Sequence, residues 1–127
     1  MPVLEKRILI VDEGSFSRVC SAILEFEGYD ADTLATIDNL KARLEGEDFG
    51  LVVTSYPYGA FLMPEIREKK IPAIVLCDQI NPEIVGVLEG TDNSFCMIKP
   101  LDYLKFKALV KRMMSGENTS HGGYKVV

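Results

Sequence analysis

Short apolar runs, each followed by a stretch with apolar residues at helical spacing, alternate five times along the chain. The runs span four to six residues and most are rich in β-branched side chains, which favours buried strands over helices. We predict strands at residues 7–11, 29–34, 51–54, 73–77 and 95–98, with the second strand weaker than the rest. We predict helices at residues 15–27, 36–45, 59–69, 81–90 and 102–115.

Residues at the helix ends and the spacing of apolar side chains refine these predictions. Ser15, Asn81 and Asp102 are expected to cap their helices, and Pro64 should shorten or kink the third helix. The spacing predicts that the first helix buries Val19, Ile23 and Phe26. For the last helix it predicts an inward stripe of Tyr103, Phe106, Val110 and Met113.

Strands that alternate with helices predict a parallel sheet with right-handed crossovers. The fold class is therefore α/β, a doubly wound five-stranded parallel sheet between two helical layers. We expect one domain at residues 1–115 and a polar tail at 116–127 that begins at Gly116. The end of the tail, residues 124–127, is expected to pair with a strand edge or with a neighbouring molecule.

The bulk composition narrows the possible functions. With 127 residues and 47% apolar content, the chain has enough material for one core. A net charge of −5 argues against nucleic-acid binding, which needs a basic surface. There is no apolar run of membrane-span or signal-peptide type, so we expect a cytoplasmic protein. The three cysteines show no zinc-like spacing, and His121 lies in a glycine-rich tail without a nucleophile pattern.

Candidate chemistry lies where the predicted strands end. In an open parallel sheet, ligands bind at the carboxyl ends of the strands. The pocket residues there are Asp12, Glu13, Ser55, Cys77, Asp78 and Lys99. The acids suit a hard divalent cation such as Mg²⁺, and the lysine suits a bound anion or the acids themselves.

These residues resemble the receiver domain of bacterial two-component response regulators, the CheY-like family with a flavodoxin-like (βα)5 fold. The resemblance covers about residues 6–115 and is carried by Ile8-Leu9-Ile10-Val11-Asp12-Glu13, Leu51-Val52-Val53-Thr54, Ala73-Ile74-Val75-Leu76 and Met97-Ile98-Lys99-Pro100. It implies that Asp12 and Glu13 hold magnesium and that Lys99 contacts a phosphoryl group. It also implies an aspartate phosphoacceptor after the third strand and a threonine or serine after the fourth.

The chain departs from that pattern at the pocket itself. Ser55 stands at the phosphoacceptor position, Cys77 replaces the threonine or serine, and Asp78 adds a negative charge next to it. Cys96 stands at the family's aromatic switch position, and the helix before the fourth strand is truncated. A serine hydroxyl is a poor nucleophile without an adjacent base, and losing one carboxylate weakens a magnesium site.

We therefore predict a pseudo-receiver: a non-enzymatic, phosphorylation-independent protein-interaction module of phosphorelay signalling. Any Mg²⁺ site at Asp12 and Glu13 should be weak, and Lys99 is expected to form a structural ion pair with Asp12. Cys77 is expected to be a packing residue, with redox sensing by a thiol near Lys99 as a minor hypothesis.

The expected partner surface involves Cys96, Leu104 and Ala108, and the partner is a histidine kinase, another signalling protein or a second copy of the chain. Two alternatives remain open. One is a genuine phosphorelay receiver with an unusual acceptor. The other is a small flavodoxin-like ligand-binding protein, disfavoured because no glycine-rich phosphate loop follows the first strand.

Overall fold

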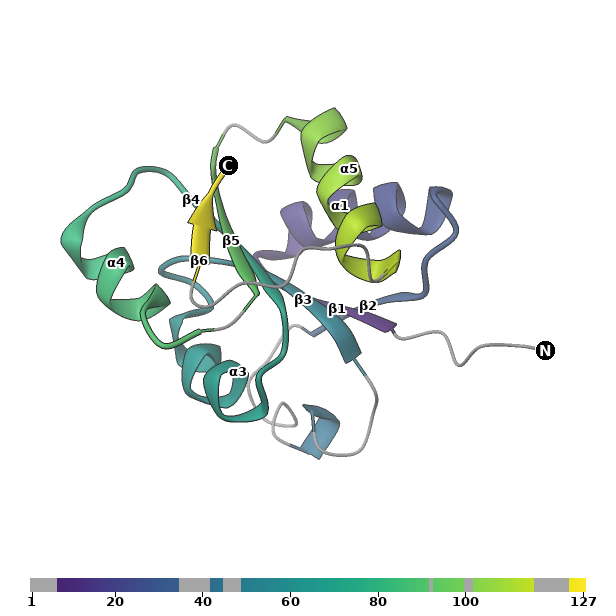
Figure 1. Ribbon diagram of the computed structural model, residues 1–127. Coiled ribbons are helices and arrows are strands. Elements are labelled where there is room, and N and C mark those ends of the chain that lie inside the picture. The colour runs from purple at the N-terminus through teal and green to yellow at the C-terminus, as the bar shows by residue number, and fades with distance from the viewer. Residues whose placement is uncertain (1–6, 35–41, 45–48, 92, 100–101, 116–123) are drawn as a thin grey trace.

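The computed structural model describes residues 7–34, 42–44, 49–91, 93–99, 102–115 and 124–127. Within these residues, one parallel sheet has the strand order β2-β1-β3-β4-β5-β6 (Figure 1). The strands are β1 (Arg7–Val11), β2 (Ala31–Thr33), β3 (Phe49–Ser55), β4 (Ala73–Cys77), β5 (Ser94–Ile98) and β6 (Tyr124–Val126). The order reverses between β1 and β3, and both are inner strands of the sheet, as their continuous apolar runs predict.

Helices cover both faces of this sheet. They are α1 (Gly14–Phe26), α3 (Met63–Lys69), α4 (Pro82–Leu88) and α5 (Tyr103–Ser115), with a short 3₁₀ turn at Ala60–Leu62 before α3. Of the predicted helix at 36–45, only residues 42–44 are described, and they are helical. None of the helices in the described ranges is long and apolar enough to span a membrane.

Two apolar cores, one on each side of the sheet, confirm the predicted three layers. On one side α1 and α5 contribute Cys20, Leu24, Phe106, Leu109 and Val110, which pack against strand residues such as Ile8 and Ile10. On the other side α3 and α4 contribute Met63, Ile66, Ile84 and Leu88. Figure 1 shows the same arrangement, with α1 and α5 together on one face and α3 and α4 on the other.

The sheet has one strand more than predicted, because the end of the tail joins it. Strand β6 pairs with β5 in parallel register, with Lys125 beside Phe95. The amide of Val127 also donates to the carbonyl of Cys96 at 2.9 Å. The expectation that residues 124–127 pair with a strand edge is confirmed, and the edge belongs to the same molecule.

The predicted buried face of α1 is wrong. The helix buries Ser17, Cys20 and Leu24, whereas Val19 is 42% exposed and Phe26 is 81% exposed. The helix carries apolar residues on two sides, and their periodicity does not indicate which side packs on the sheet. Its N-cap is Glu13, and Ser15 lies inside the first turn.

The remaining helix predictions hold in part. Asn81 Oδ1 accepts from the amide of Ile84 at 3.0 Å, and Asp102 Oδ1 accepts from the amide of Lys105 at 3.0 Å, so both cap their helices as predicted. Pro64 lies in the first turn of α3, where a missing amide costs nothing. In α5 the inward stripe includes Leu109, and Tyr103 is 49% exposed instead of buried.

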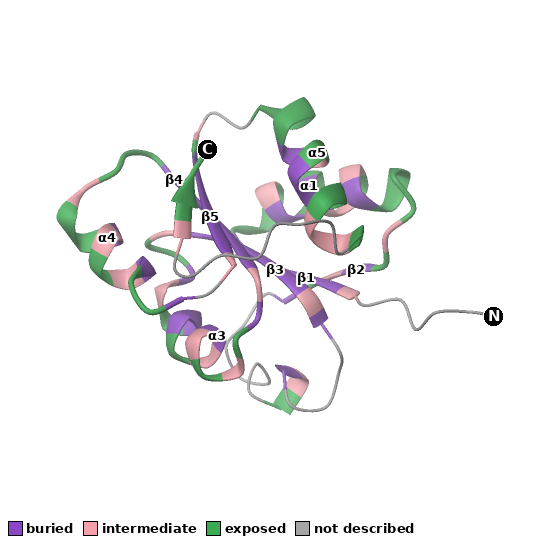
Figure 2. Cartoon of the chain, in the orientation of Figure 1, coloured by how far each residue is buried: buried purple, intermediate pink, exposed green. Residues whose placement is uncertain are grey.

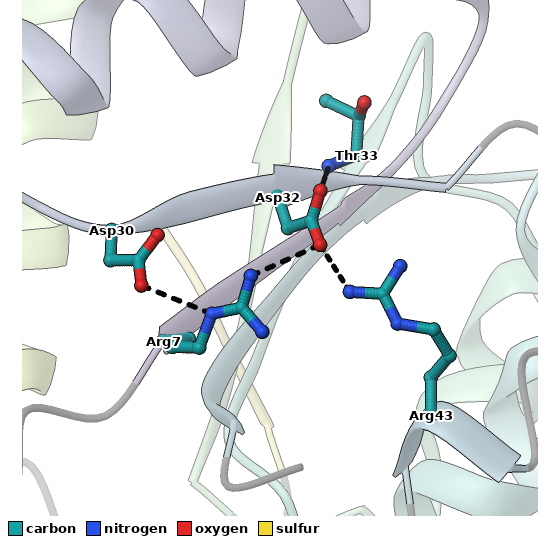
Figure 3. Close-up of polar contacts among 5 residues, drawn as sticks. All are labelled: Arg7, Asp30, Asp32, Thr33 and Arg43. Atoms are coloured by element: carbon teal, nitrogen blue, oxygen red, sulfur yellow. Dashed lines mark hydrogen bonds and ion pairs between the residues drawn. The ribbon is translucent and has the colours of Figure 1, made fainter.

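A charged network ties β2 to β1 at the amino end of the sheet. Arg7 on β1 pairs with Asp30 and Asp32 at 3.1 Å each, and Arg43 also pairs with Asp32 (Figure 3). Both guanidinium groups lie over the Phe49 ring, 5.4 and 5.7 Å from its centroid. This network lies at the end of the strands opposite to the candidate site.

Candidate functional site

Asp12 and Ser55 meet at the carboxyl ends of the neighbouring inner strands β1 and β3, and both side chains are buried. Asp12 follows β1 and is 2% exposed; Ser55 ends β3 and is 4% exposed. The hydroxyl of Ser55 donates to Asp12 Oδ1 at 2.6 Å, and the amide of Glu13 donates to the same oxygen at 2.8 Å. The other oxygen, Asp12 Oδ2, is buried with no hydrogen-bond partner in the described part of the chain.

Neighbouring hydroxyls hold this pair in place through the backbone. Ser17 on α1 donates to the carbonyl of Asp12 at 2.8 Å, which fixes the start of the helix against the strand end. Thr54, just before Ser55, donates to the carbonyl of Val11 at 2.7 Å. The two strand ends are therefore fixed by side-chain bonds as well as by the sheet, and the site is rigid on the β1 and β3 side.

The acids next to the pair are more open. Glu13 and Asp78 are exposed, so neither is desolvated in the way that Asp12 is. Across the described residues no group of three or more Asp, Glu, His or Cys side chains is placed to hold a metal ion. The residues offer one unpartnered buried oxygen on Asp12 and one exposed carboxylate on Glu13, which fit only a weakly held divalent cation.

Lys99 does not form the ion pair with Asp12 that the sequence suggested. No ion pair between the two is found, although both residues are described, and Lys99 Nζ instead lies 4.9 Å from the centroid of the Phe16 ring. Its amide continues the strand ladder by donating to the carbonyl of Cys77 at 2.8 Å. Sequence reasoning missed Phe16, because an aromatic residue in a first helical turn gives no signal of a cation contact. Pro100, the other half of the Lys-Pro motif, lies outside the described residues.

Cys77 and Cys96 contact each other in the core. Their sulfurs are 3.4 Å apart, and Cys77 Sγ also lies 3.8 Å from the carbonyl oxygen of Met97. The side chains are 2% and 0% exposed. Burial, followed by the hydrogen bond with Cys77, raises the pKa of Cys96 to about 12. Since a thiolate is the reactive form, these contacts favour packing over redox sensing, as the sequence indicated.

The predicted partner surface is only partly available. Leu104 is 75% exposed and Ala108 is exposed, both on α5. Cys96 is completely buried on β5, so its placement on that surface was wrong. The reason is that β5 is not an edge strand: β6 covers its edge, and helices α3 and α4 cover the Cys96 side.

The rim of the site contains contacts that the sequence did not predict. The hydroxyl of Tyr56 donates to Glu83 Oε2 at 3.3 Å, which links the segment after β3 to the start of α4. Tyr58 and Ile80, also near these strand ends, are 37% and 40% exposed. The two tyrosines therefore differ in their surroundings: Tyr56 packs partly against the core, whereas Tyr58 is exposed.

Comparison with solved structures identifies the fold. The chain superposes on a CheY-like response regulator receiver domain protein from Methanospirillum hungatei JF-1 with a TM-score of 0.73 and 24% identity, over 87% of this chain and 94% of that chain. It matches response regulator protein TrrA from Thermotoga maritima, solved in complex with Mg(2+)-BeF, with a TM-score of 0.70 and 23% identity over 85% and 98%. It matches the beryllofluoride-activated NtrC4 receiver domain dimer with a TM-score of 0.71 and 24% identity over 87% and 97%.

No family model matches the sequence, and no curated protein is detectably similar to it. At identities below one quarter, the structural matches establish the receiver-type, CheY-like fold. The predicted fold class is confirmed, apart from the additional strand β6.

Proposed function

We propose that the chain is a cytoplasmic, receiver-like module of two-component phosphorelay signalling that accepts no phosphoryl group and acts through protein–protein contacts. The observation that carries this proposal is the 2.6 Å hydrogen bond from Ser55 to Asp12. The receiver resemblance calls for an aspartate at position 55. Its replacement by a hydroxyl, with the proton directed at the neighbouring acid, gives the pocket a fixed polar pair in place of a nucleophile.

The geometry of this pair opposes group transfer. A serine needs a base and access to its substrate, and Asp12 supplies the first without the second. Ser55 and Asp12 are 4% and 2% exposed, so the hydroxyl offers little accessible surface to a phosphodonor. Lys99, the residue that would contact a phosphoryl oxygen, rests on Phe16. These two contacts and the burial of Ser55 and Asp12 support a pocket held in one state.

A divalent cation would bind this pocket only weakly. Asp12 Oδ2 and Glu13 supply two carboxylates, and Mg²⁺ prefers six oxygen ligands in octahedral geometry. We expect a dissociation constant of about 1 mM or weaker. The hydrogen bond between Ser55 and Asp12 takes the place of part of the charge compensation that a bound cation would provide.

The partners follow from the receiver-like fold. The NtrC4 receiver domain among the structural matches is a dimer, and the TrrA protein was solved with Mg(2+)-BeF. For this chain we propose contact with a histidine kinase, another signalling protein or a second copy of itself. Exposed apolar residues on α5, Leu104 among them, support such a role.

Phosphodonor treatment followed by intact-mass measurement tests the proposal. The protein is incubated with Mg²⁺ and a small acyl phosphate, next to a receiver domain that has its acceptor aspartate and reports that the donor is active. We expect no phosphoryl adduct on the wild-type chain. An adduct that is absent from the Ser55→Ala variant would overturn the proposal and establish an unusual serine acceptor.

The Ser55→Asp variant tests whether residues other than Ser55 also prevent phosphorylation. Ser115→Asp, which changes an exposed residue at the end of α5, is the matched control. Phosphorylation of Ser55→Asp alone would assign the block to the missing aspartate. No adduct on either variant would assign it also to Cys77, Asp78 or the truncated segment before β4, and it would agree with the pseudo-receiver proposal.

A further inference from the structure

The outer side of α1 carries an apolar stripe that the fold leaves uncovered. Val19 and Phe26 are 42% and 81% exposed, Ala22 is exposed and Ile23 is half-buried. Their spacing of three or four residues places them on one side of the helix. The opposite side holds the buried residues Ser17, Cys20 and Leu24. Figure 2 shows exposed positions along α1, which lies beside α5 on the same face of the sheet.

A surface hollow adjoins this stripe. It has a volume of about 400 Å³ and is lined by Ala22, Ile23, Phe26, Glu27 and Lys107. Lys107 belongs to α5, so the hollow lies between the two helices. Its walls are mainly apolar, with one acid and one base on the rim. Such a hollow beside a small residue is where a side chain from a second helix packs.

Charged residues flank the stripe in a self-complementary order. Arg18 and Glu25 are exposed on the same flank of α1, seven residues apart, and neither forms an ion pair with another described residue. Val19 and Phe26 on the stripe are also seven residues apart. Both pairs are centred next to Ala22. An antiparallel copy of the helix that crosses at Ala22 therefore brings Arg18 within about one residue of the level of Glu25, and Phe26 within about one residue of the level of Val19, twice over.

We propose that α1 is a self-association surface, on which a second copy of this chain docks with its own α1 antiparallel and crossing at Ala22. A twofold interface needs a patch that is complementary to itself. This stripe is self-complementary in its apolar pairs and in its charges. The small side chain of Ala22 lets the two backbones approach, and each Val19 packs against Phe26 and the hollow of the other copy. This surface is separate from the Ser55 pocket, so the inference does not depend on the absence of phosphorylation.

The occupant is a second copy because the charges on the stripe balance. A strongly acidic or basic partner would match only one of Arg18 and Glu25, whereas a second copy matches both. A helix of 13 residues offers a small contact area, so the dimer should be weak, with a dissociation constant on the order of 10–100 µM.

Sedimentation equilibrium of the full chain from about 10 µM to 1 mM tests the proposal. We expect a concentration-dependent dimer for the wild type and a dissociation constant raised at least about 30-fold by Phe26→Glu. Phe61→Glu is the matched control, since it also places an acid at an exposed phenylalanine, 37% exposed, but in the 3₁₀ turn before α3. Both variants should keep the wild-type circular dichroism, because neither side chain is in a core.

A charge swap then tests the antiparallel register. Arg18→Glu and Glu25→Arg should each weaken the dimer by about 3–10-fold, and the double variant should restore it to within about twofold. A wild type that stays monomeric at 1 mM would overturn the proposal. A dimer unaffected by Phe26→Glu would overturn it too, as would a double variant that remains as weak as the single ones.

Discussion

Gly59 and Thr54 lie in such close contact that no side chain fits at position 59. A Cβ atom there would overlap Thr54 Oγ1 and would lie 3.1 Å from the carbonyl oxygen of Ser55. Thr54 has no room to move, because its hydroxyl donates to the carbonyl of Val11. The amide of Gly59 also donates to the Ser55 carbonyl at 2.6 Å. A glycine therefore closes the turn after β3 directly against the candidate site.

We predict that Gly59→Ala destabilises the protein by about 1–3 kcal/mol, since the added methyl must displace a fixed hydroxyl and backbone. Urea denaturation followed by circular dichroism measures the change. Gly86→Ala is the control: it lies in α4 with open space around its Cβ position, and it should stabilise the protein by about 0.5–1 kcal/mol. Equal effects of the two substitutions would contradict the close contact at Gly59.

The Ser55–Asp12 bond should also contribute to stability. We predict that Ser55→Ala lowers the free energy of unfolding by about 1–3 kcal/mol, because it leaves the buried Asp12 carboxylate with one donor in place of two. Ser115→Ala, at an exposed hydroxyl at the end of α5 that donates to the carbonyl of Arg112 at 3.1 Å, should change it by less than about 0.5 kcal/mol. Both values come from the same urea titration. A Ser55→Ala variant as stable as the wild type would show that the bond does not hold the pocket.

The fold was predictable because most of its elements carry redundant signals. The strand Ala73–Cys77 has apolar residues on both sides and was predicted to the residue, and the helix at Pro82 combines a cap, a proline and an acid. Such agreement between pattern and local chemistry leaves little choice of structure. The predicted order of strands and helices is confirmed wherever the structure describes it.

Two predictions, the buried side of α1 and the partner of Lys99, failed for the same physical reason. In each case more than one packing partner was possible. In α1 the apolar residues form two stripes, and only the sheet decides which of them is buried; Leu24 is, and Phe26 is not. At the site, the sequence offered Asp12 as a partner for Lys99, but Lys99 lies against the Phe16 ring and Ser55 supplies a donor to Asp12. That Asp12 and Ser55 meet could be predicted from the strand ends, but the hydrogen bonds and contacts around them depended on distances that a sequence does not contain.

The Asp32 network predicts a dependence of stability on pH. Burial alone would raise the pKa of Asp32, but the hydrogen bond and charge of Arg43, the Thr33 amide and the charge of Arg7 outweigh it and lower the pKa from 3.8. A lowered pKa in the folded state means that the ionised network stabilises the protein above about pH 4. That contribution is lost as the pH falls through the folded-state pKa.

We expect Asp32→Asn to lose about 0.5–1 kcal/mol of stability at pH 7, since the group is partly exposed to solvent. The difference from the wild type should shrink below about pH 3.8. Urea titrations at a series of pH values measure it. Asp30→Asn, at a carboxylate that is 61% exposed, should show a smaller loss. A stability difference between Asp32→Asn and the wild type that stays constant down to pH 2.5 would contradict the lowered pKa of Asp32.

Strand β6 gives a prediction in which neighbouring positions should behave differently. The carbonyl of Cys96 accepts from the amide of Val127, so in the alternating pattern of a strand the amide of Lys125 also points toward β5 and that of Val126 points to solvent. Proline at position 125 removes a ladder hydrogen bond, whereas proline at 126 removes none.

We therefore expect Lys125→Pro to release β6 and speed hydrogen exchange at the Cys96 amide, which faces β6 on the same side as its carbonyl. A lost edge bond of about 1 kcal/mol corresponds to an increase of about fivefold, and complete release of the strand would give more. Val126→Pro should leave exchange within about twofold of the wild type. The comparison is made by amide hydrogen exchange resolved to β5. Equal acceleration by both prolines would mean that β6 pairs in another register, and no acceleration by either would mean that the tail does not protect the sheet edge in solution.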